Sequence, residues 1–214
     1  MSMDGAMVDV KRSYDSSRRQ EQARRNRDAV LNAAERRFLA DGYGVTTITA
    51  IASEAGVSAE TVYKRFGGKA GLVTAIWERG LAGRGPVPAP QRSDEMQARE
   101  EDPRQIIRNW GQLTAEVAPR VAPILLLVRA AAATDPEMAR LLADADRQRL
   151  RRMRHNAEAL TDHLRTGMSP GEAAEIMWTY SSPDLYDLLV VRRRWTLPRY
   201  SRFISEAMIN ALLR

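Results

Sequence analysis

The chain has 214 residues, 44% of them hydrophobic and 28% charged, which is typical of a globular protein with a buried core. It contains no cysteine, so disulfides and cysteine-ligated zinc sites are excluded. The net charge is +6, and residues 11–40 carry nine basic and four acidic side chains. This positive excess indicates either a segment that binds the phosphate backbone of a nucleic acid or a solvated tail.

The first predicted helix follows a polar N-terminal segment. Residues 1–17 show no apolar periodicity and are predicted to form a disordered basic arm. From about residue 18 to residue 40 a helix is expected, because Val30 and Phe38 belong to an apolar stripe that recurs every four residues. Two glycines within residues 41–44 then end this helix.

Residues 45–69 contain two short helical patterns joined by a glycine turn. Thr47 can cap the first helix, whose apolar residues recur at helical spacing. Gly56 lies where the chain must bend, and glycine takes the left-handed conformation there without steric cost. Ser58 can cap the second helix, predicted over residues 59–64. Such a pair forms a helix-turn-helix unit, whose second helix is sized to enter a DNA major groove.

A fourth helix and a linker follow. The helix is predicted over residues 69–81, after two consecutive glycines. Residues 83–100 are rich in proline, glycine and charge, so we expect a flexible loop or linker and a domain boundary near residue 83.

The rest of the chain is predicted to be helical. Pro119 and Pro123 indicate a break between its first two helices, and no strand signal or internal repeat appears. The expected fold class is all-α, with a DNA-binding domain over residues 18–82 and a helical domain over residues 101–214. The predicted helices of the second domain cover residues 103–117, 121–133, 137–165, 170–180, 183–192 and 197–213.

A combination of residues from Arg27 to Ile76 forms one extended pattern, which covers about a quarter of the chain. It resembles the Tet repressor (TetR) family of transcription regulators. The resemblance implies a three-helix DNA-binding domain followed by a helical domain that binds a ligand and dimerises. One departure is Ala70-Gly71, where many members have an acidic residue after the lysine. The matching residues are Val30, Leu31, Ala33, Ala34, Phe38, Gly42, Tyr43, Thr46, Thr47, Ile51, Ala52, Ala55, Gly56, Val57, Ser58, Thr61, Val62, Tyr63, Phe66, Lys69 and Leu72.

The resemblance also implies which residues contact DNA. Those at the start of the second short helix would read base edges, where Thr61 can touch a thymine methyl and Glu60 can accept from cytosine N4. Lys69 would bind phosphate, helped by the free N–H groups at a helix N-terminus. A packing role for Tyr63 and a dipole-complementing role for Glu60 remain open. The predicted DNA-contacting residues are Thr47, Ala59, Glu60, Thr61, Tyr63, Lys64, Lys69, Arg24 and Arg25.

The second domain offers candidates for a ligand pocket. Arg129 is a single charge in an apolar helix, so it either anchors an anionic ligand or pairs with an acid such as Glu116 or Asp144. Large apolar side chains can line the same pocket or belong to an ordinary core. The candidate pocket residues are Trp110, Arg129, Met138, Met153, Trp178 and Tyr180.

A dimer interface is expected on the last two helices, as a four-helix bundle with a second copy. The candidate interface residues are Leu185, Leu188, Leu189, Phe203, Met208 and Leu212. His155 and His163 are eight residues apart, too far for one metal ion, so no metal site is predicted.

The functional hypothesis is a homodimeric repressor that a small molecule releases from a palindromic operator. The alternative is a DNA-binding regulator or architectural protein without small-molecule control. No phosphate loop, cysteine nucleophile or histidine cluster appears, so we expect neither catalysis nor a cofactor. No segment has signal-peptide or membrane-spanning length, so we expect a cytoplasmic protein with no membrane partner. The expected partners are double-stranded DNA, a second copy and an unknown effector.

Overall fold

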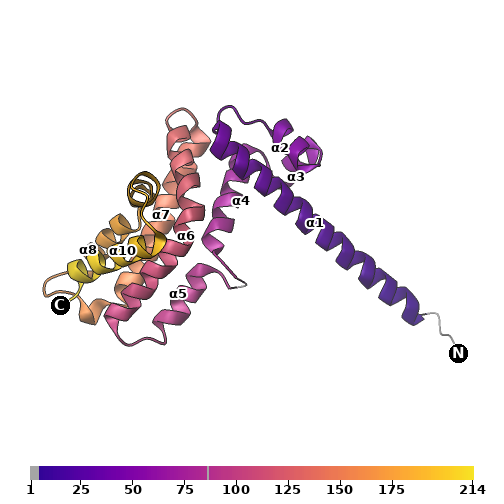
Figure 1. Cartoon of the computed structure of the whole chain (residues 1–214). Coiled ribbons are helices and arrows are strands. Elements are labelled where there is room, and N and C mark those ends of the chain that lie inside the picture. Colours follow the sequence, from indigo (N-terminus) through magenta and orange to yellow (C-terminus); the bar gives the residue numbers. More distant parts are fainter. Residues whose placement is uncertain (1–4, 86) are drawn as a thin grey trace. The chain divides into compact units, whose positions relative to one another are not determined.

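The computed structural model describes residues 5–85 and 87–214, with side chains from residue 18 onward. The described part of the chain is helical and contains no strand, only an isolated β-bridge between Leu164 and Leu213 (Figure 1). This confirms the all-α class. Two compact units divide between Leu72 and Val73, inside helix α4 (Lys69–Ala82), rather than after that helix as predicted.

The first unit contains α1 (Gly5–Asp41), α2 (Ile48–Ala55), α3 (Ala59–Phe66) and the start of α4. The backbone of α1 is helical from Gly5, whereas a disordered arm was predicted up to residue 17. No glycine or proline lies between Gly5 and the end of α1, so nothing in the backbone interrupts the helix. Residues 1–4 of the predicted arm lie outside the described residues.

The helix-turn-helix forms with the predicted caps. The side chain of Thr47 accepts a hydrogen bond from Ala50 N at 3.1 Å, which caps α2. Gly56 ends α2 with φ 67°, in the left-handed region where glycine is favoured. Ser58 Oγ then accepts from Thr61 N at 3.1 Å and caps α3. The turn is therefore built from the local interactions that the sequence indicated.

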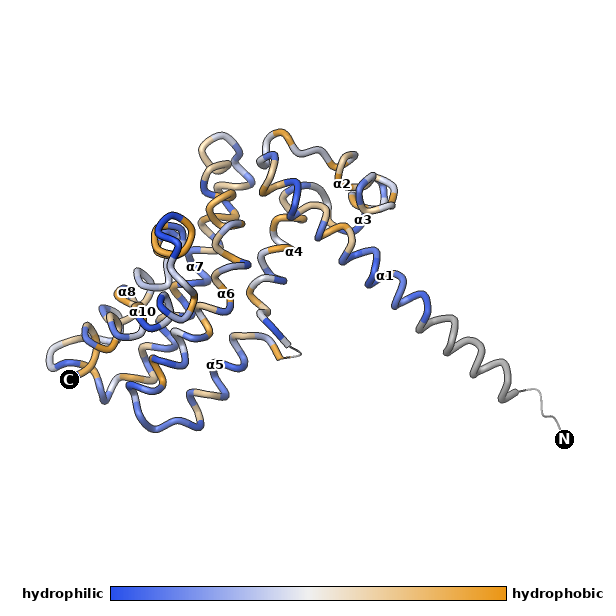
Figure 2. The backbone as a smooth tube through the Cα atoms, in the orientation of Figure 1, coloured by the Kyte–Doolittle hydropathy of each residue, from blue (hydrophilic) through white to orange (hydrophobic). Residues whose placement is uncertain are grey.

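The apolar stripe of α1 forms the core of the first unit. Along α1 the hydropathy changes from hydrophilic to hydrophobic toward its C-terminal end (Figure 2), where Leu31 and Phe38 are completely buried. Glu54 of α2 pairs with Arg36 at 2.8 Å and with Arg37 at 2.6 Å, so α2 is also tied to α1 at the surface. Together these contacts hold α2, and the turn that leads to α3, on the C-terminal part of α1.

The second unit is built around α6 (Pro103–Ala132), which packs against α5 (Ala89–Gln97), α7 (Pro136–Glu158), α9 (Pro183–Tyr186) and α10 (Leu197–Leu212). The predicted break in α6 is wrong, because the helix continues through Pro119 and Pro123. An interior proline costs about 3 kcal/mol, but packing against four neighbours buries much of this helix and offsets that cost.

Helix α5 lies within the segment that was predicted to be a flexible linker. Ala89 and Ser93 are buried, and Arg92 pairs with Glu116 of α6 at 2.6 Å. Two side-chain hydrogen bonds from Arg92 form this contact, and they lower the pKa of Glu116. These contacts involve residues distant in sequence, so the composition of the segment did not reveal the helix.

Two other predicted boundaries differ. Helix α7 ends at Glu158, and a short 3-10 turn at Thr161–His163 follows it instead of a helix that continues to residue 165. After α8 (Pro170–Tyr180), α9 passes directly into a π-helical stretch at Asp187–Arg192 before α10 begins.

Candidate functional site

One face of α3 is buried and the other is open to solvent. Val62 is completely buried, whereas Tyr63 is 55% exposed. Glu60 and Lys64 also lie at the surface, and Ala59 is half-buried at the start of the helix. The residues of α3 that are expected to contact DNA therefore lie on its solvent side, opposite the side that packs.

Thr61 is oriented by the cap of its own helix. Its hydroxyl lies 2.8 Å from Ser58 Oγ, the same oxygen that accepts from its backbone N–H. This contact limits rotation of the Thr61 side chain, which is exposed at the surface. A β-branched side chain that is already held in one orientation suits contact with a base edge.

Replacing Thr61 with alanine is expected to relax base preference at one position of each half-site. The change removes the methyl and the hydroxyl but leaves the Ser58 cap on the backbone N–H in place. Thr61→Ser is the matched control, since it restores the hydroxyl alone. Affinities for a set of single-base operator variants would measure the effect, at about 1–3 kcal/mol for a lost base contact. An unchanged ranking of those variants would remove Thr61 from base readout.

Two further contacts position the ends of α3 and α4. Arg65 donates to the carbonyl of Ala23 at 2.9 Å, which ties the end of α3 to α1. At the start of α4, Lys69 Nζ donates to the carbonyl of Tyr43 at 2.7 Å and lies 4.4 Å from the centre of the Tyr43 ring. Lys69 is half-buried and held against the loop before α2. Its ammonium group thus occupies a defined place beside the helix N-terminus.

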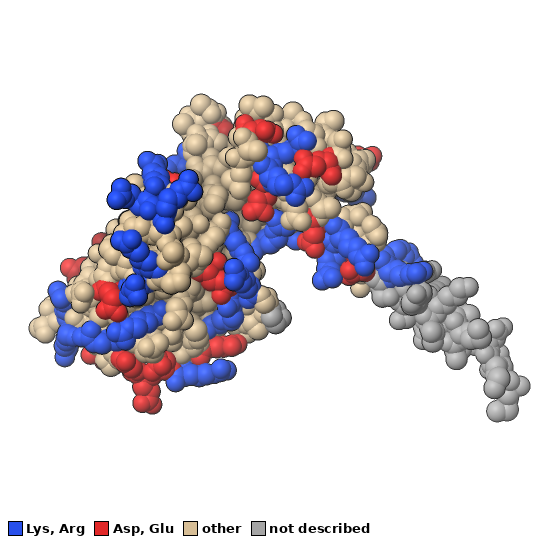
Figure 3. All heavy atoms as spheres, in the orientation of Figure 1, with Lys and Arg blue, Asp and Glu red and all other residues tan. Residues whose placement is uncertain are grey.

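Basic side chains extend the charged surface along α1 (Figure 3). Arg24 and Arg25 are more than two-thirds exposed, and both pair with Glu21, at 3.2 and 3.1 Å. Hydrogen bonds from Arg24 and then Arg25 lower the pKa of Glu21. Two positive charges share one carboxylate, so this turn of α1 keeps a net positive charge.

The second unit contains a cavity of about 300 Å³. Side chains of α4 to α8 and α10 line it, and most of them are apolar. Among the candidate pocket residues, the cavity brings together Trp110, Met153 and Tyr180. Met138 is completely buried elsewhere in the core and does not line it, and neither does Trp178.

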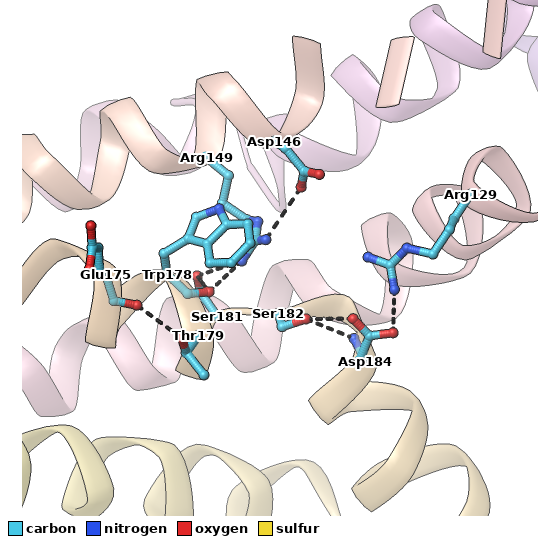
Figure 4. Close-up of polar contacts among 9 residues, drawn as sticks. All are labelled: Arg129, Asp146, Arg149, Glu175, Trp178, Thr179, Ser181, Ser182 and Asp184. Atoms are coloured by element: carbon cyan, nitrogen blue, oxygen red, sulfur yellow. Dashed lines mark hydrogen bonds and ion pairs between the residues drawn. The ribbon is translucent and has the colours of Figure 1, made fainter. Parts of the chain in front are cut away.

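Arg129 also lies outside the cavity lining, and it forms an ion pair with Asp184 (Figure 4). The pair is exposed to solvent, and its hydrogen bond lowers the pKa of Asp184. Arg129 was expected either to anchor an anionic ligand or to form an ion pair with Glu116 or Asp144. The structure supports an ion pair, but its partner is Asp184. Glu116 pairs with Arg92, and Asp144 pairs with Arg147.

Arg149 is a cavity residue that the sequence analysis missed. It donates to the carbonyl of Trp178 and to Ser181 Oγ, and its guanidinium lies 4.2 Å from the centre of the Trp178 ring (Figure 4). Asp146 pairs with it at 3.4 Å. Burial lowers the pKa of Arg149. Nothing in the local pattern distinguishes Arg149, since it is one of many arginines along a charged helix.

The six candidate dimer residues differ in exposure and form three pairs. Leu188 and Phe203 are 47% and 40% exposed. Phe203 packs edge-on against Trp195, with ring centres 5.5 Å apart. Met208 and Leu212 instead face the core of their own unit, where they are buried. The available apolar surface therefore lies on the outer side of α10 and on the π-helical stretch before it.

The two other candidate dimer residues, Leu185 and Leu189, are partly buried against a cluster within the same unit.

The two histidines do not lie on one helix. His155 contacts Asp94 at 3.1 Å, and His163 lies in the 3-10 turn. No group of three metal-binding side chains occurs among the described residues. In the same part of the chain, no helix is long and apolar enough to cross a membrane.

Comparison with known proteins gives a family match for part of the chain and fold matches for most of it. Residues 30–76 match the bacterial regulatory proteins of the tetR family. No curated protein matches the chain in sequence.

One similar solved structure is that of NalD, the secondary repressor of the MexAB-OprM multidrug efflux pump in Pseudomonas aeruginosa. NalD is 21% identical to this chain, with a TM-score of 0.72. The match covers 91% of this chain and 98% of NalD. SmeT in its complex with triclosan is 22% identical to this chain, with a TM-score of 0.69. The match covers 88% of this chain and 92% of SmeT. SmeT represses the SmeDEF multidrug efflux pump of Stenotrophomonas maltophilia. The fatty acid degradation regulator FadR from Bacillus halodurans is 13% identical to this chain, with a TM-score of 0.70. The match covers 86% of this chain and 94% of FadR. At these identities the likeness establishes the fold.

Proposed function

Because the chain carries the DNA-binding domain of the tetR family of bacterial regulatory proteins over residues 30–76, we propose that it is a homodimeric, ligand-responsive repressor of transcription. The observation that carries the proposal is the solvent face of α3, where Glu60, Thr61 and Tyr63 lie opposite the buried Val62. Recognition helices of this kind enter the major groove with their N-terminal residues toward the bases. The cytoplasm is where such a protein would meet its operator.

Phosphate contacts would fix the register of α3 on the duplex. Thr47, Tyr63 and Lys64 present hydroxyl and ammonium groups at the surface of the helix-turn-helix, and Lys69 adds the N-terminus of α4. Arg24 and Arg25 place further positive charge on α1. Such contacts carry no sequence information, so base preference would come from the start of α3.

Dimerisation is proposed through the exposed apolar surface around Leu188 and Phe203. A twofold dimer would present two copies of α3, and a palindromic site with half-sites about one helical turn apart would match that symmetry. Val191 is also 46% exposed beside Leu188, so the apolar surface includes more than single side chains.

Ligand control is proposed through the cavity of the second unit. A ligand releases the operator only if it binds two conformations of the dimer unequally. Trp77 and Leu81 of α4 line the cavity, and α4 begins at Lys69, so one helix joins the cavity wall to a proposed phosphate contact. The repressors NalD and SmeT share this fold, and SmeT binds triclosan. The cavity also favours this function over an architectural DNA-binder without ligand control.

Selection of bound duplexes from a random DNA pool would test the proposal. We expect enrichment of one approximately palindromic site, with two protein copies per duplex in sedimentation experiments. Thr61→Ala in parallel should change the enriched sequence at symmetric positions. A pool that shows no enrichment would reject sequence-specific binding, and one copy per duplex would reject the dimer.

A further inference from the structure

The cavity of the second unit opens between α5 and α7. Among the described residues that line it, only Pro90 of α5 and Gln148 of α7 are exposed, whereas the others are buried or half-buried. A lining residue that is open to bulk water marks the mouth. Asp94 lies one turn after Pro90, and Arg152 lies one turn after Gln148. Asp94 and Arg152 pair at 2.6 Å, so charged groups border the mouth.

The lining residues carry positive charge and no negative charge. Arg149 and Arg152 both line the cavity, and no aspartate or glutamate does so in the described part of the chain. The two arginines are three positions apart on α7, a spacing that brings their Cβ atoms to about 5–6 Å on one side of a helix. One small anionic group can therefore interact with both positive charges.

The acids that pair with these arginines are more open to water than the arginines themselves. Asp146 lies 3.4 Å from Arg149 and is 42% exposed, whereas the Arg149 side chain is 15% exposed (Figure 4). Asp94 is 48% exposed, against 25% for Arg152. Water screens an exposed charge more than a half-buried one. Burial also lowers the pKa of Arg149, because a buried cation loses hydration. The cavity side of α7 therefore keeps a positive potential.

Arg152 retains N–H donors for a further partner. A guanidinium carries several N–H groups in a fixed fork, and among the described residues Arg152 donates only to Asp94 Oδ1. The same oxygen lies 3.1 Å from His155 Nε2, so Asp94 is shared between two side chains of α7. Since Arg152 lines the cavity beside its mouth, its remaining donors suit a carboxylate bound there.

The interior of the cavity favours an apolar ring system. Trp77, Trp110, Tyr180 and Tyr200 contribute aromatic rings, with leucine, valine, alanine and methionine side chains between them. Aromatic walls pack well against rings in offset or edge-on arrangements. The volume of about 300 Å³ is at the lower end for small-molecule pockets, which indicates a compact ligand.

We propose that the effector is a compact monocarboxylate with an apolar ring body, whose carboxylate lies at the mouth and accepts hydrogen bonds from Arg152, while Arg149 adds a second positive charge. This inference rests on the proposed function, since it names the ligand class of the proposed effector cavity. Hydrogen bonds between arginine and carboxylate are among the stronger ones in proteins. At the mouth the carboxylate also keeps part of its hydration, which lowers the cost of binding a charge.

Three matched probes test the charge of the ligand by isothermal titration calorimetry on the full-length protein. They are biphenyl-4-carboxylate, biphenyl-4-carboxamide and biphenyl-4-ylmethylammonium, which share one ring system and are negative, neutral and positive. We expect the carboxylate to bind about tenfold or more tightly than the carboxamide, the factor for a charge-assisted hydrogen bond, and the ammonium to bind most weakly. Equal or tighter binding of the carboxamide or the ammonium, or no binding of the carboxylate, would overturn the inference.

A substitution on α7 locates the carboxylate. Arg152→Gln keeps a polar side chain but removes the charge, so it should weaken binding of biphenyl-4-carboxylate about tenfold and leave binding of the carboxamide unchanged. Arg147→Gln is the matched control, because Arg147 belongs to the same helix, is 63% exposed and lies outside the cavity lining. Equal effects of the two variants would contradict the assigned position.

Asp94→Asn separates direct contact from a structural role of Arg152. The variant removes the acid that competes for Arg152, so we expect biphenyl-4-carboxylate to bind about threefold more tightly. If Arg152 acted only by holding α5 through Asp94, this variant would weaken binding, as Arg152→Gln does. Asp94→Asn keeps Arg152 and thus also tests the site if Arg152→Gln does not fold. Unchanged or weaker binding would reject the direct contact.

These outcomes remain distinct from those of the DNA selection. Calorimetry with the three probes is carried out without DNA, and enrichment of an operator needs no ligand. A failed charge preference would thus leave the regulator proposal standing, whereas a failed selection would leave the measured ligand preference standing.

Discussion

Replacing Lys69 with alanine is expected to weaken DNA binding to the same extent on every sequence and to make binding less sensitive to salt. A phosphate contact releases counterions when it forms, and its loss lowers the steepness of log K against log salt by about one unit. A symmetric dimer would place two copies of Lys69 on the duplex, so we expect the slope of log K against log salt to change by about two units. Affinities measured by fluorescence anisotropy over a series of salt concentrations would give the slope.

The contact of Lys69 with the Tyr43 carbonyl provides a control for this experiment. Lys69→Gln removes the positive charge but keeps an N–H donor that can reach toward that carbonyl. We expect it to reduce the salt slope as Lys69→Ala does, with a smaller loss of thermal stability. A slope equal to that of the wild type in both variants would exclude Lys69 from the phosphate contacts and leave it a role in holding the loop before α2.

Replacing Gly71 with alanine is expected to destabilise the first unit and to abolish operator binding with it. A Cβ at this position would lie 1.8 Å from the carbonyl oxygen of Phe66, which is a backbone atom and cannot rotate away. Overpacking of this kind costs about 3 kcal/mol. For the first unit, Met1–Leu72, that corresponds to a fall of roughly 12–24 °C in the melting temperature.

Gly44→Ala is the matched control for Gly71→Ala, since a Cβ on Gly44 would meet no atom within 4 Å. Circular dichroism melting curves of the two variants would separate a local clash from a general effect of replacing glycine. A Gly71→Ala protein with the melting temperature and DNA affinity of the wild type would show that the end of α3 can move away from α4.

The parts of the fold that depend on neighbours in sequence were predictable. The caps of α2 and α3 at Thr47 and Ser58 need only a hydroxyl within three residues of a free N–H, so spacing alone indicated them. The stripe that includes Phe38 likewise follows from a period of about four residues. These are the elements in which local preference and tertiary packing agree.

The parts that depend on distant contacts were not predictable in this way. Helix α5 is held by the Arg92–Glu116 ion pair, which joins residues 24 apart, and α6 continues through Pro119 because of the helices that surround it. The partner of Arg129 is Asp184, 55 residues away in the sequence. Such pairs involve ordinary charged residues, and nothing in their local pattern indicates which of them meet.

The candidate cavity shows the same limit. Trp110, Met153 and Tyr180 were predicted from size and hydrophobicity, and the same criteria also selected Met138, which lies in the core. Arg149 belongs to the cavity wall although its helix is charged, because its guanidinium lies against the Trp178 ring and is partly buried there. Side-chain direction within a bundle depends on helix rotation, which composition does not specify.

The ratio of two affinities tests most directly the claim that α3 reads DNA sequence. The enriched palindrome and a scrambled duplex of the same length and composition would be titrated with the full-length protein at one physiological salt concentration. We expect the palindrome to bind at least about a thousandfold more tightly, the lower end of the range for specific over non-specific binding. Equal affinities for the two duplexes would contradict sequence readout by α3.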